Sequence, residues 1–192
     1  MNFSISVIIP VYNCERFIEK AVKSVIEQPE VLEVVIINDG STDNTENILA
    51  NLQGQNLAVK IYYHEDNLNK GRSASRNLGI KMAEGNYIAF LDADDFYLKN
   101  RFANDKKQMD NDPTIDGVYN AVGFHYYRKI KDHELKNFKP NTVSKKIAPD
   151  ELFDSIVSSK YGYLHLDGLL VKASVFQSIG LFNETLMVAE DS

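Results

Sequence analysis

The stretch Tyr87-Ile88-Ala89-Phe90-Leu91-Asp92-Ala93-Asp94-Asp95 decides the fold of this chain. Its first five residues are apolar and predict a strand that is buried in a sheet. Three carboxylates then follow within four positions, although like charges repel one another and each resists removal from water. A hard divalent cation resolves this conflict because it prefers carboxylate oxygens as ligands. The stretch therefore predicts a metal site at the carboxyl end of a strand, beside a ligand that carries phosphate.

Apolar runs alternate with helical patterns throughout the preceding part of the chain. Further strands are predicted over 5–9, 33–37 and 58–63, and helices over 15–27, 42–51 and 71–84. This order predicts an α/β fold with a Rossmann-like, mostly parallel sheet and helices on both faces. The strands are nearly continuous apolar runs, as burial on both faces requires. Asn13 is expected to cap the first helix, and Gly85 to end the third.

The second half of the chain is less regular. Helices are predicted over 99–109, 151–158 and 174–179, with a long strand over 118–127, a polar loop or exposed hairpin over 128–147 and a short strand over 169–171. The sequence stops at Ser192 without a capping pattern, so we expect a chain whose C-terminal part is missing. No internal repeat or low-complexity linker divides the chain, which suits a single domain.

Composition and charge exclude several classes of protein. The 192 residues carry a formal net charge of −6, which gives no electrostatic support to nucleic-acid binding. Cys14 is the single cysteine, so no disulfide forms within the chain, which fits a reducing compartment. No apolar segment approaches the roughly 18–20 residues that cross a bilayer, and the N-terminus lacks a signal-peptide pattern. We expect a cytoplasmic protein with no transmembrane segment, or one with peripheral contact at the inner face of the membrane.

Polar residues follow each of the four predicted parallel strands. In open parallel sheets, ligands bind beyond the carboxyl ends of the strands, so these segments are expected to converge. They are Pro10-Val11-Tyr12-Asn13, the Asn38 to Asp43 run, His64 to Asn67 leading to Lys70-Gly71-Arg72, and the acidic stretch 92–95. Each alone has an ordinary structural explanation, such as a turn, a helix cap or a surface ion pair. Together on one edge they predict a binding site.

The chemistry of these segments suits a nucleotide diphosphate. Tyr12 offers an aromatic surface to a base, and Asp39 accepts from a base N–H or a ribose hydroxyl. Gly40 permits close backbone approach. Arg72 and Arg76 suit phosphate oxygens. In the acidic stretch, Asp92 is assigned to a ribose hydroxyl and Asp94 to the metal.

The chain resembles family 2 glycosyltransferases of the GT-A fold. The resemblance rests on Ser6 to Asn13, Asn38 to Asp43, the Asn67 to Gly79 stretch with Gly71, Ala74, Arg76 and Asn77, and Gly85 to Asp95. Their order and spacing agree with the family across residues 4–95, and the agreement is looser over 96–180. The terminal Glu190-Asp191, preceded by Gly180-Leu181-Phe182-Asn183-Glu184, resembles the family's catalytic-base motif.

The resemblance implies transfer of a sugar from a nucleotide donor, usually a UDP-sugar, to an acceptor hydroxyl with inversion. The acceptor would be a saccharide or a lipid-linked saccharide, in polysaccharide or glycoconjugate synthesis. Asp92-Ala93-Asp94 corresponds to the DxD motif, in which Asp94 binds Mn²⁺ or Mg²⁺. Asp191 would deprotonate the acceptor, with Glu190 beside it. Residues 1–95 would form the nucleotide-sugar-binding half of the domain, and residues 96–192 the acceptor-side half.

Individual residues can therefore be assigned to each expected role. The expected donor-binding residues are Pro10, Val11, Tyr12, Asn13, Asp39, Gly40, Ser41, Asn67, Gly71, Arg72, Arg76, Asp92 and Ala93. The expected metal ligand is Asp94, and the expected catalytic residues are Asp191 and Glu190.

Other classes fit the sequence less well. A sugar nucleotidyltransferase would carry a glycine-rich, basic loop where Pro10 to Asn13 stand. A haloacid-dehalogenase-type phosphatase would place its Asp-x-Asp after the first strand, and a dinucleotide-dependent oxidoreductase would show G-x-G-x-x-G there. The chain has no Trp and no Gln-x-x-Arg-Trp, which argues against a processive synthase. A nucleotide-binding fragment without transfer activity stays an alternative.

Overall fold

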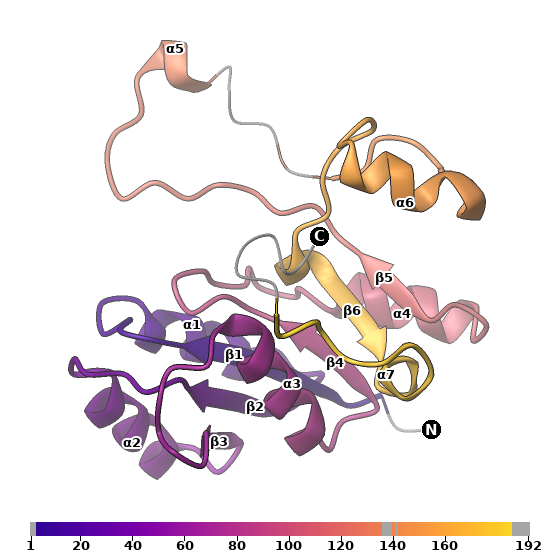
Figure 1. Ribbon diagram of the computed structural model, residues 1–192. Coiled ribbons are helices and arrows are strands. Elements are labelled where there is room, and N and C mark those ends of the chain that lie inside the picture. The colour runs from indigo at the N-terminus through magenta and orange to yellow at the C-terminus, as the bar shows by residue number, and fades with distance from the viewer. Residues whose placement is uncertain (1–2, 136–139, 141, 186–192) are drawn as a thin grey trace.

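A computed structural model describes residues 3–135, 140 and 142–185, and within them one six-stranded sheet organises the fold (Figure 1). The strand order is β3-β2-β1-β4-β6-β5. The strands are β1 (Ile5–Val11), β2 (Val31–Asn38), β3 (Val59–Tyr63), β4 (Tyr87–Phe90), β5 (Gly117–Tyr119) and β6 (Leu169–Lys172). Strands β3, β2, β1 and β4 are parallel, and β6 runs opposite to both of its neighbours. The predicted α/β architecture is confirmed.

Helices cover both faces of this sheet. The helices are α1 (Ile18–Ile26), α2 (Thr45–Gln55), α3 (Arg72–Met82), α4 (Ala103–Asn111), α5 (Asp132–Leu135), α6 (Pro149–Val157) and α7 (Ser174–Ile179). Alternate β1 residues face opposite ways, so Val7 packs in one core with α1 and α2 while Ile8 packs in another with α3 and α7. In the described ranges, no helix combines the length and apolarity that a membrane crossing needs.

Several predicted helix boundaries are wrong, since α2 and α4 begin at Thr45 and Ala103 rather than at 42 and 99. Two further differences have reasons that lie in tertiary structure. Helix α1 begins at Ile18, and Asn13 instead has φ 51° with its side chain bonded to the loop after β2. Helix α3 ends at Met82, before Gly85. A Cβ at Gly85 would lie 2.6 Å from the Ser6 nitrogen, and the Gly85 N–H donates to Ser6 Oγ over 2.8 Å. Gly85 therefore permits close approach to β1, and Asn13 joins two loops.

The long strand predicted over 118–127 is also wrong. Strand β5 ends at Tyr119, because its partner β6 has only four residues and pairing stops at Leu169. The chain then leaves the sheet and carries α5 at the end of a long excursion (Figure 1). Phe124 and Tyr127 lie in this part and are 53% and 65% exposed, so their apolarity does not reflect a core. The chain returns through α6 and the 3₁₀ turn η1 (Leu166–Gly168), which leads into β6.

Candidate functional site

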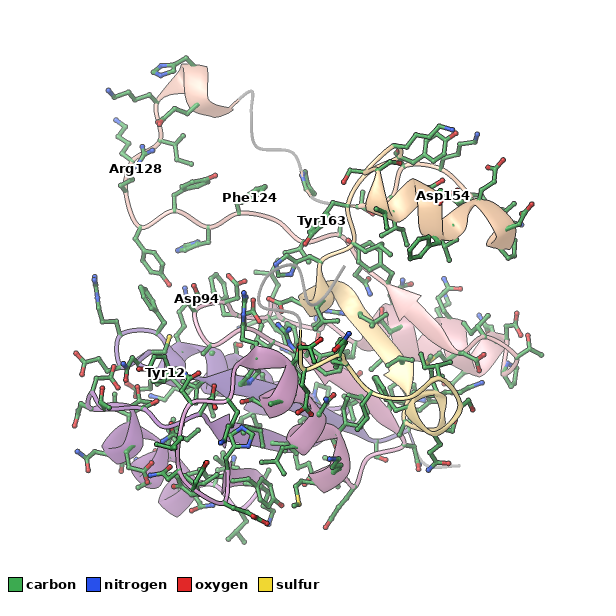
Figure 2. The ribbon with its side chains drawn as sticks, in the orientation of Figure 1. Tyr12, Asp94, Phe124, Arg128, Asp154 and Tyr163 are labelled. Carbon is green, nitrogen blue, oxygen red and sulfur yellow. The ribbon has the colours of Figure 1, made fainter. Side chains whose placement is uncertain are left out.

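The loops at the carboxyl ends of the parallel strands enclose a cavity of about 690 Å³. The register places Val11, at the end of β1, opposite Asn38 of β2, and the Leu91 N–H donates to the Ile8 carbonyl. The segments after β1, β2 and β4 therefore lie side by side. The cavity is lined by Pro10, Val11, Tyr12, Asn13, Cys14, Phe17, Asp39, Asn69, Lys70, Gly71, Arg72, Ser73, Asp92, Ala93, Asp94 and Glu184. Figure 2 shows Tyr12 and Asp94 at the same edge of the sheet.

Asn13 and Ser41 hold the first two loops together. The Asn13 side-chain oxygen accepts from the Thr42 N–H over 2.7 Å, and the Asn13 N–H donates to Ser41 Oγ over 3.0 Å. Asn13 lines the cavity, whereas Ser41 is not among the lining residues. The two side chains thus fix the position of Tyr12, which is 49% exposed at the cavity wall.

Asp39 joins the end of β2 to the start of α3. Its carboxylate accepts from the backbone N–H groups of Lys70 and Gly71, over 2.7 and 2.9 Å, and is only 4% exposed. His64 Nε2 lies 3.4 Å from Asp39 Oδ1. Burial raises the pKa of Asp39 above its ordinary value, and the two N–H groups offset part of that effect. Asp39 is also one of the residues that line the cavity.

Two glycines shape the wall beside Asp39. A Cβ at Gly40, where φ is +75°, would lie 2.9 Å from the Asn67 carbonyl oxygen. Gly40 and Asn67 are packed against each other and do not line the cavity. A Cβ at Gly71, where φ is +88°, would meet nothing within 4 Å, so the space beside this residue is open. Gly71 immediately precedes α3, and the N-terminal N–H groups of a helix favour anions.

The acidic turn after β4 forms the opposite wall, where Asp92, Ala93 and Asp94 line the cavity. Burial raises the pKa of Asp94, and the carboxylates of Asp95 and Asp92 raise it further, while Arg72 lowers it. A divalent cation on the cavity side would relieve this accumulated negative charge. The Asp94 carboxylate, with the negative charge of Asp92 beside it, therefore fits Mn²⁺ or Mg²⁺.

Arg76 lies beneath this wall and is not among the lining residues. It is 1% exposed, and its Nη2 lies 3.1 Å from Asp92 Oδ1. Its Nε and Nη1 atoms are buried without a hydrogen-bond partner in the described part of the chain. Arg76 thus contacts Asp92 and supports its position, and its contact with a ligand stays a prediction.

Glu184 is a lining residue that the sequence patterns do not single out. Asn77 of α3 donates to Glu184 Oε1 and to the Phe182 carbonyl, over 2.7 and 2.9 Å, and accepts from the Phe182 N–H over 2.9 Å. These bonds hold residues 182–184 against the cavity. The signal in the sequence is Asn77 in the middle of a predicted helix, because an amide that becomes buried there requires hydrogen-bond partners. Glu190 and Asp191 lie outside the described residues.

A family model described as glycosyl transferase family 2 matches residues 6–160. The chain belongs to glycosyltransferase family 2. This family 2 chain is 34% identical over 194 residues to an uncharacterized glycosyltransferase of Rickettsia felis, covering 97% of the chain and 30% of that protein. It is 28% identical over 194 residues to the minor teichoic acid biosynthesis protein GgaB of Bacillus subtilis, covering 100% of the chain and 20% of GgaB.

Solved structures place the family 2 chain in the GT-A fold. S. aureus TarS 1–349 in complex with UDP superposes with a TM-score of 0.71 at 24% identity, over 98% of this chain and 52% of that one. The mannosyltransferase PcManGT from Pyrobaculum calidifontis, in complex with GDP-Man and Mn²⁺, superposes with a TM-score of 0.64 at 21% identity, over 95% and 48%. These likenesses establish the fold. The chain spans about half or less of the length of the proteins it matches.

Proposed function

We propose that this chain transfers a sugar from a nucleoside diphosphate donor, a UDP-sugar, to an acceptor hydroxyl with inversion at the anomeric carbon. The observation that carries the proposal is the convergence of four sequence-distant segments on one cavity of about 690 Å³. Tyr12 and Asp39 at one side suit a base and its ribose, and the acidic turn at the other side suits a cation. S. aureus TarS, which shares the fold, is described in complexes with UDP and UDP-GlcNAc, and this supports the choice of donor.

The diphosphate would lie against the start of α3. Gly71, Arg72 and Ser73 line the cavity there. Ser73 Oγ is buried without a hydrogen-bond partner in the described ranges, and Gly71 leaves open space beside the helix terminus. N–H groups of a helix N-terminus, an arginine and a free hydroxyl together offer the donors that phosphate oxygens accept from.

A divalent cation held by Asp94 would offset the charge that grows on the leaving diphosphate. The chain's own residues would supply the proton transfer. Asp191 would take the proton of the acceptor hydroxyl, with Glu190 beside it. The acceptor oxygen then bonds to the anomeric carbon as the bond from that carbon to the diphosphate oxygen breaks. Attack opposite the leaving group inverts the configuration in a single displacement.

The wider setting that we propose is polysaccharide or glycoconjugate synthesis with a saccharide or lipid-linked acceptor. The name of the relative GgaB supports this setting. Residues 1–95 would bind the donor and residues 96–192 the acceptor. We place the protein in the cytoplasm, with peripheral contact at the inner face of the membrane where the acceptor is lipid-linked.

Two variants test the mechanism. Asp94→Ala should abolish Mn²⁺- or Mg²⁺-dependent turnover of a UDP-sugar while leaving the circular dichroism spectrum unchanged. Asp191→Asn should abolish transfer and leave UDP binding intact, measured by calorimetry. Asp110→Asn is a matched control because its carboxylate pairs with Lys106 at the surface, away from the cavity. Turnover without a divalent metal, or full activity of Asp94→Ala, would contradict the metal assignment.

Two other results would point to the alternatives. UDP binding without transfer to any acceptor would favour a nucleotide-binding role. Formation of a UDP-sugar from UTP and a sugar phosphate would favour a nucleotidyltransferase.

A further inference from the structure

A second group of metal-ligating side chains lies behind the acidic turn. Asp92, Asp95, His165 and Asp167 each offer one ligand atom, and these atoms all lie within 4.8 Å of one another. Two of the residues follow β4, and the other two lie at the start of η1. Asp92 lines the donor cavity, whereas Asp95 and Asp167 line a separate cavity of about 260 Å³. The group therefore lies between the two cavities, and Asp94 is not part of it.

Asp167 is the member that points to a ligand. Its side chain is only 5% exposed. Its Oδ1 accepts from the Asp92 N–H over 3.1 Å, but its Oδ2 is buried without a hydrogen-bond partner in the described residues. A buried carboxylate oxygen without a donor is costly, so this one calls for a positively charged partner.

Neighbouring cations do not supply that partner. Arg76 contacts Asp92 Oδ1 at 3.1 Å. Arg101 pairs with Asp105 Oδ2 at 2.6 Å and donates to the Gly168 carbonyl over 2.9 Å. Neither guanidinium has a contact with the carboxylates of Asp95 or Asp167 among the described ion pairs. A single proton would neutralise only one of these carboxylates.

His165 completes the ligand set. Its Nδ1 lies 3.8 Å from Asp167 Oδ1, which is too long for a hydrogen bond but suits two ligands of one ion. The Asp167 N–H donates to Nδ1 over 3.4 Å, a long hydrogen bond that holds this nitrogen only weakly.

We propose that Asp92, Asp95, His165 and Asp167 form a divalent-cation site separate from the donor-side site at Asp94. One imidazole and three carboxylates suit Mn²⁺ or Zn²⁺ better than Ca²⁺, which takes oxygen ligands. An ion there joins the turn after β4 to η1 and thereby fixes Asp92 from the side opposite the donor cavity. The proposal goes beyond glycosyl transfer, because it requires neither a nucleotide nor an acceptor.

Metal binding to the whole chain, without nucleotide, tests the proposal. We expect titrations with Mn²⁺ or Zn²⁺ to show a site whose affinity falls at least tenfold in His165→Ala and Asp167→Asn. Asp167→Asn keeps an oxygen for the Asp92 N–H and removes the charge, so the local fold is preserved. His133→Ala is the matched control, since His133 is exposed on α5. Asp94→Ala should leave this site intact.

Two further measurements distinguish a bound ion from a shared proton at this cluster. Pulsed electron paramagnetic resonance of bound Mn²⁺ should show coupling to an imidazole nitrogen in the wild type and in Asp94→Ala, and none in His165→Ala. The ion should raise the melting temperature of the wild type and raise that of Asp167→Asn by less. Equal metal affinity in all variants, or no nitrogen coupling in the wild type, would overturn the proposal and assign a shared proton to the cluster. Loss of UDP binding or of sugar transfer bears on the proposed function alone, since neither enters these measurements.

Discussion

The parallel strands β1 to β4 and the segment from β5 to β6 differ in what holds them in place. The parallel strands pack on both faces, and every residue of β1 is buried. Beyond Tyr119 the described chain leaves the sheet, and Phe124, labelled in Figure 2, is 53% exposed. Phe153 of α6 is 76% exposed. The loops that line the cavity are thus supported by a continuous core, whereas the later part of the chain is joined to them through polar contacts.

Those contacts lie where the two halves meet. Asn77 bonds to Phe182 and Glu184, and the Asp92 N–H donates to Asp167. Each joins a residue of the donor side to a segment that arrives about 75 to 107 positions later in the chain. One edge of the sheet therefore has two roles: it carries the loops that line the cavity, and it anchors the later part of the chain beside them.

The largest expected effect concerns the core of the parallel strands. Phe90 is 1% exposed and packs edge-to-face with Phe176 and Phe182, so Phe90→Ala should lower the free energy of unfolding by about 3–5 kcal/mol. Phe153→Ala is the matched change in the other region, where the ring is 76% exposed, and should alter it by only about 0.5 kcal/mol. Chemical denaturation of both variants measures the contrast. Similar losses would mean that α6 is covered and that the two regions are equally buried.

An intermediate effect is expected at the joint between the regions. Asn77→Ala removes three hydrogen bonds to residues 182–184 and should cost about 1–3 kcal/mol of stability. Because those residues lead toward Asp191, sugar transfer should fall more than UDP affinity does. Asn47→Ala is the control, since that amide bonds only to Asn44 on the surface. An equal loss of transfer and of UDP affinity would show that Asn77 supports the donor site instead.

The smallest expected effect concerns the pKa values of two carboxylates, one in each region. Burial raises the pKa of Asp39, whereas bonds from Arg128 lower the pKa of the partly exposed Glu134 to about 2. The folded chain holds the Glu134 proton less tightly than the unfolded chain, so the pair stabilises α5 above about pH 4.5 and stops doing so as the pH falls to about 2. Carboxyl NMR titration should give a midpoint near 2 for Glu134 and one above 3.8 for Asp39.

Arg128→Gln provides the control for that titration. The variant should return the Glu134 midpoint to the ordinary range and leave Asp39 unchanged. A Glu134 midpoint that stays near 2 in the variant would assign the shift to the Lys131 N–H, which also donates to this carboxylate.

The sequence alone determined the fold and the edge on which the candidate site lies. Buried parallel strands require continuous apolar runs, and the chain must place polar residues where those runs stop. Four strands, three helices between them and ten of the predicted donor and metal residues at one cavity therefore follow from local patterns. The family follows from the same motifs, because the order and spacing of those polar segments are specific.

Tertiary structure alone decided what each polar side chain contacts. Asn13, expected to cap a helix, bonds to a loop 29 positions away, and Gly85, expected to end a helix, lies against Ser6. Arg76 carries a charged side chain of the kind that usually lies at the surface, yet folding buries it beneath Asp92. His165 and Asp167 reach the acidic turn only because β6 pairs with β4. Local patterns record whether a side chain is apolar, but the partner of a buried charge or amide is set by which distant segments the sheet brings together.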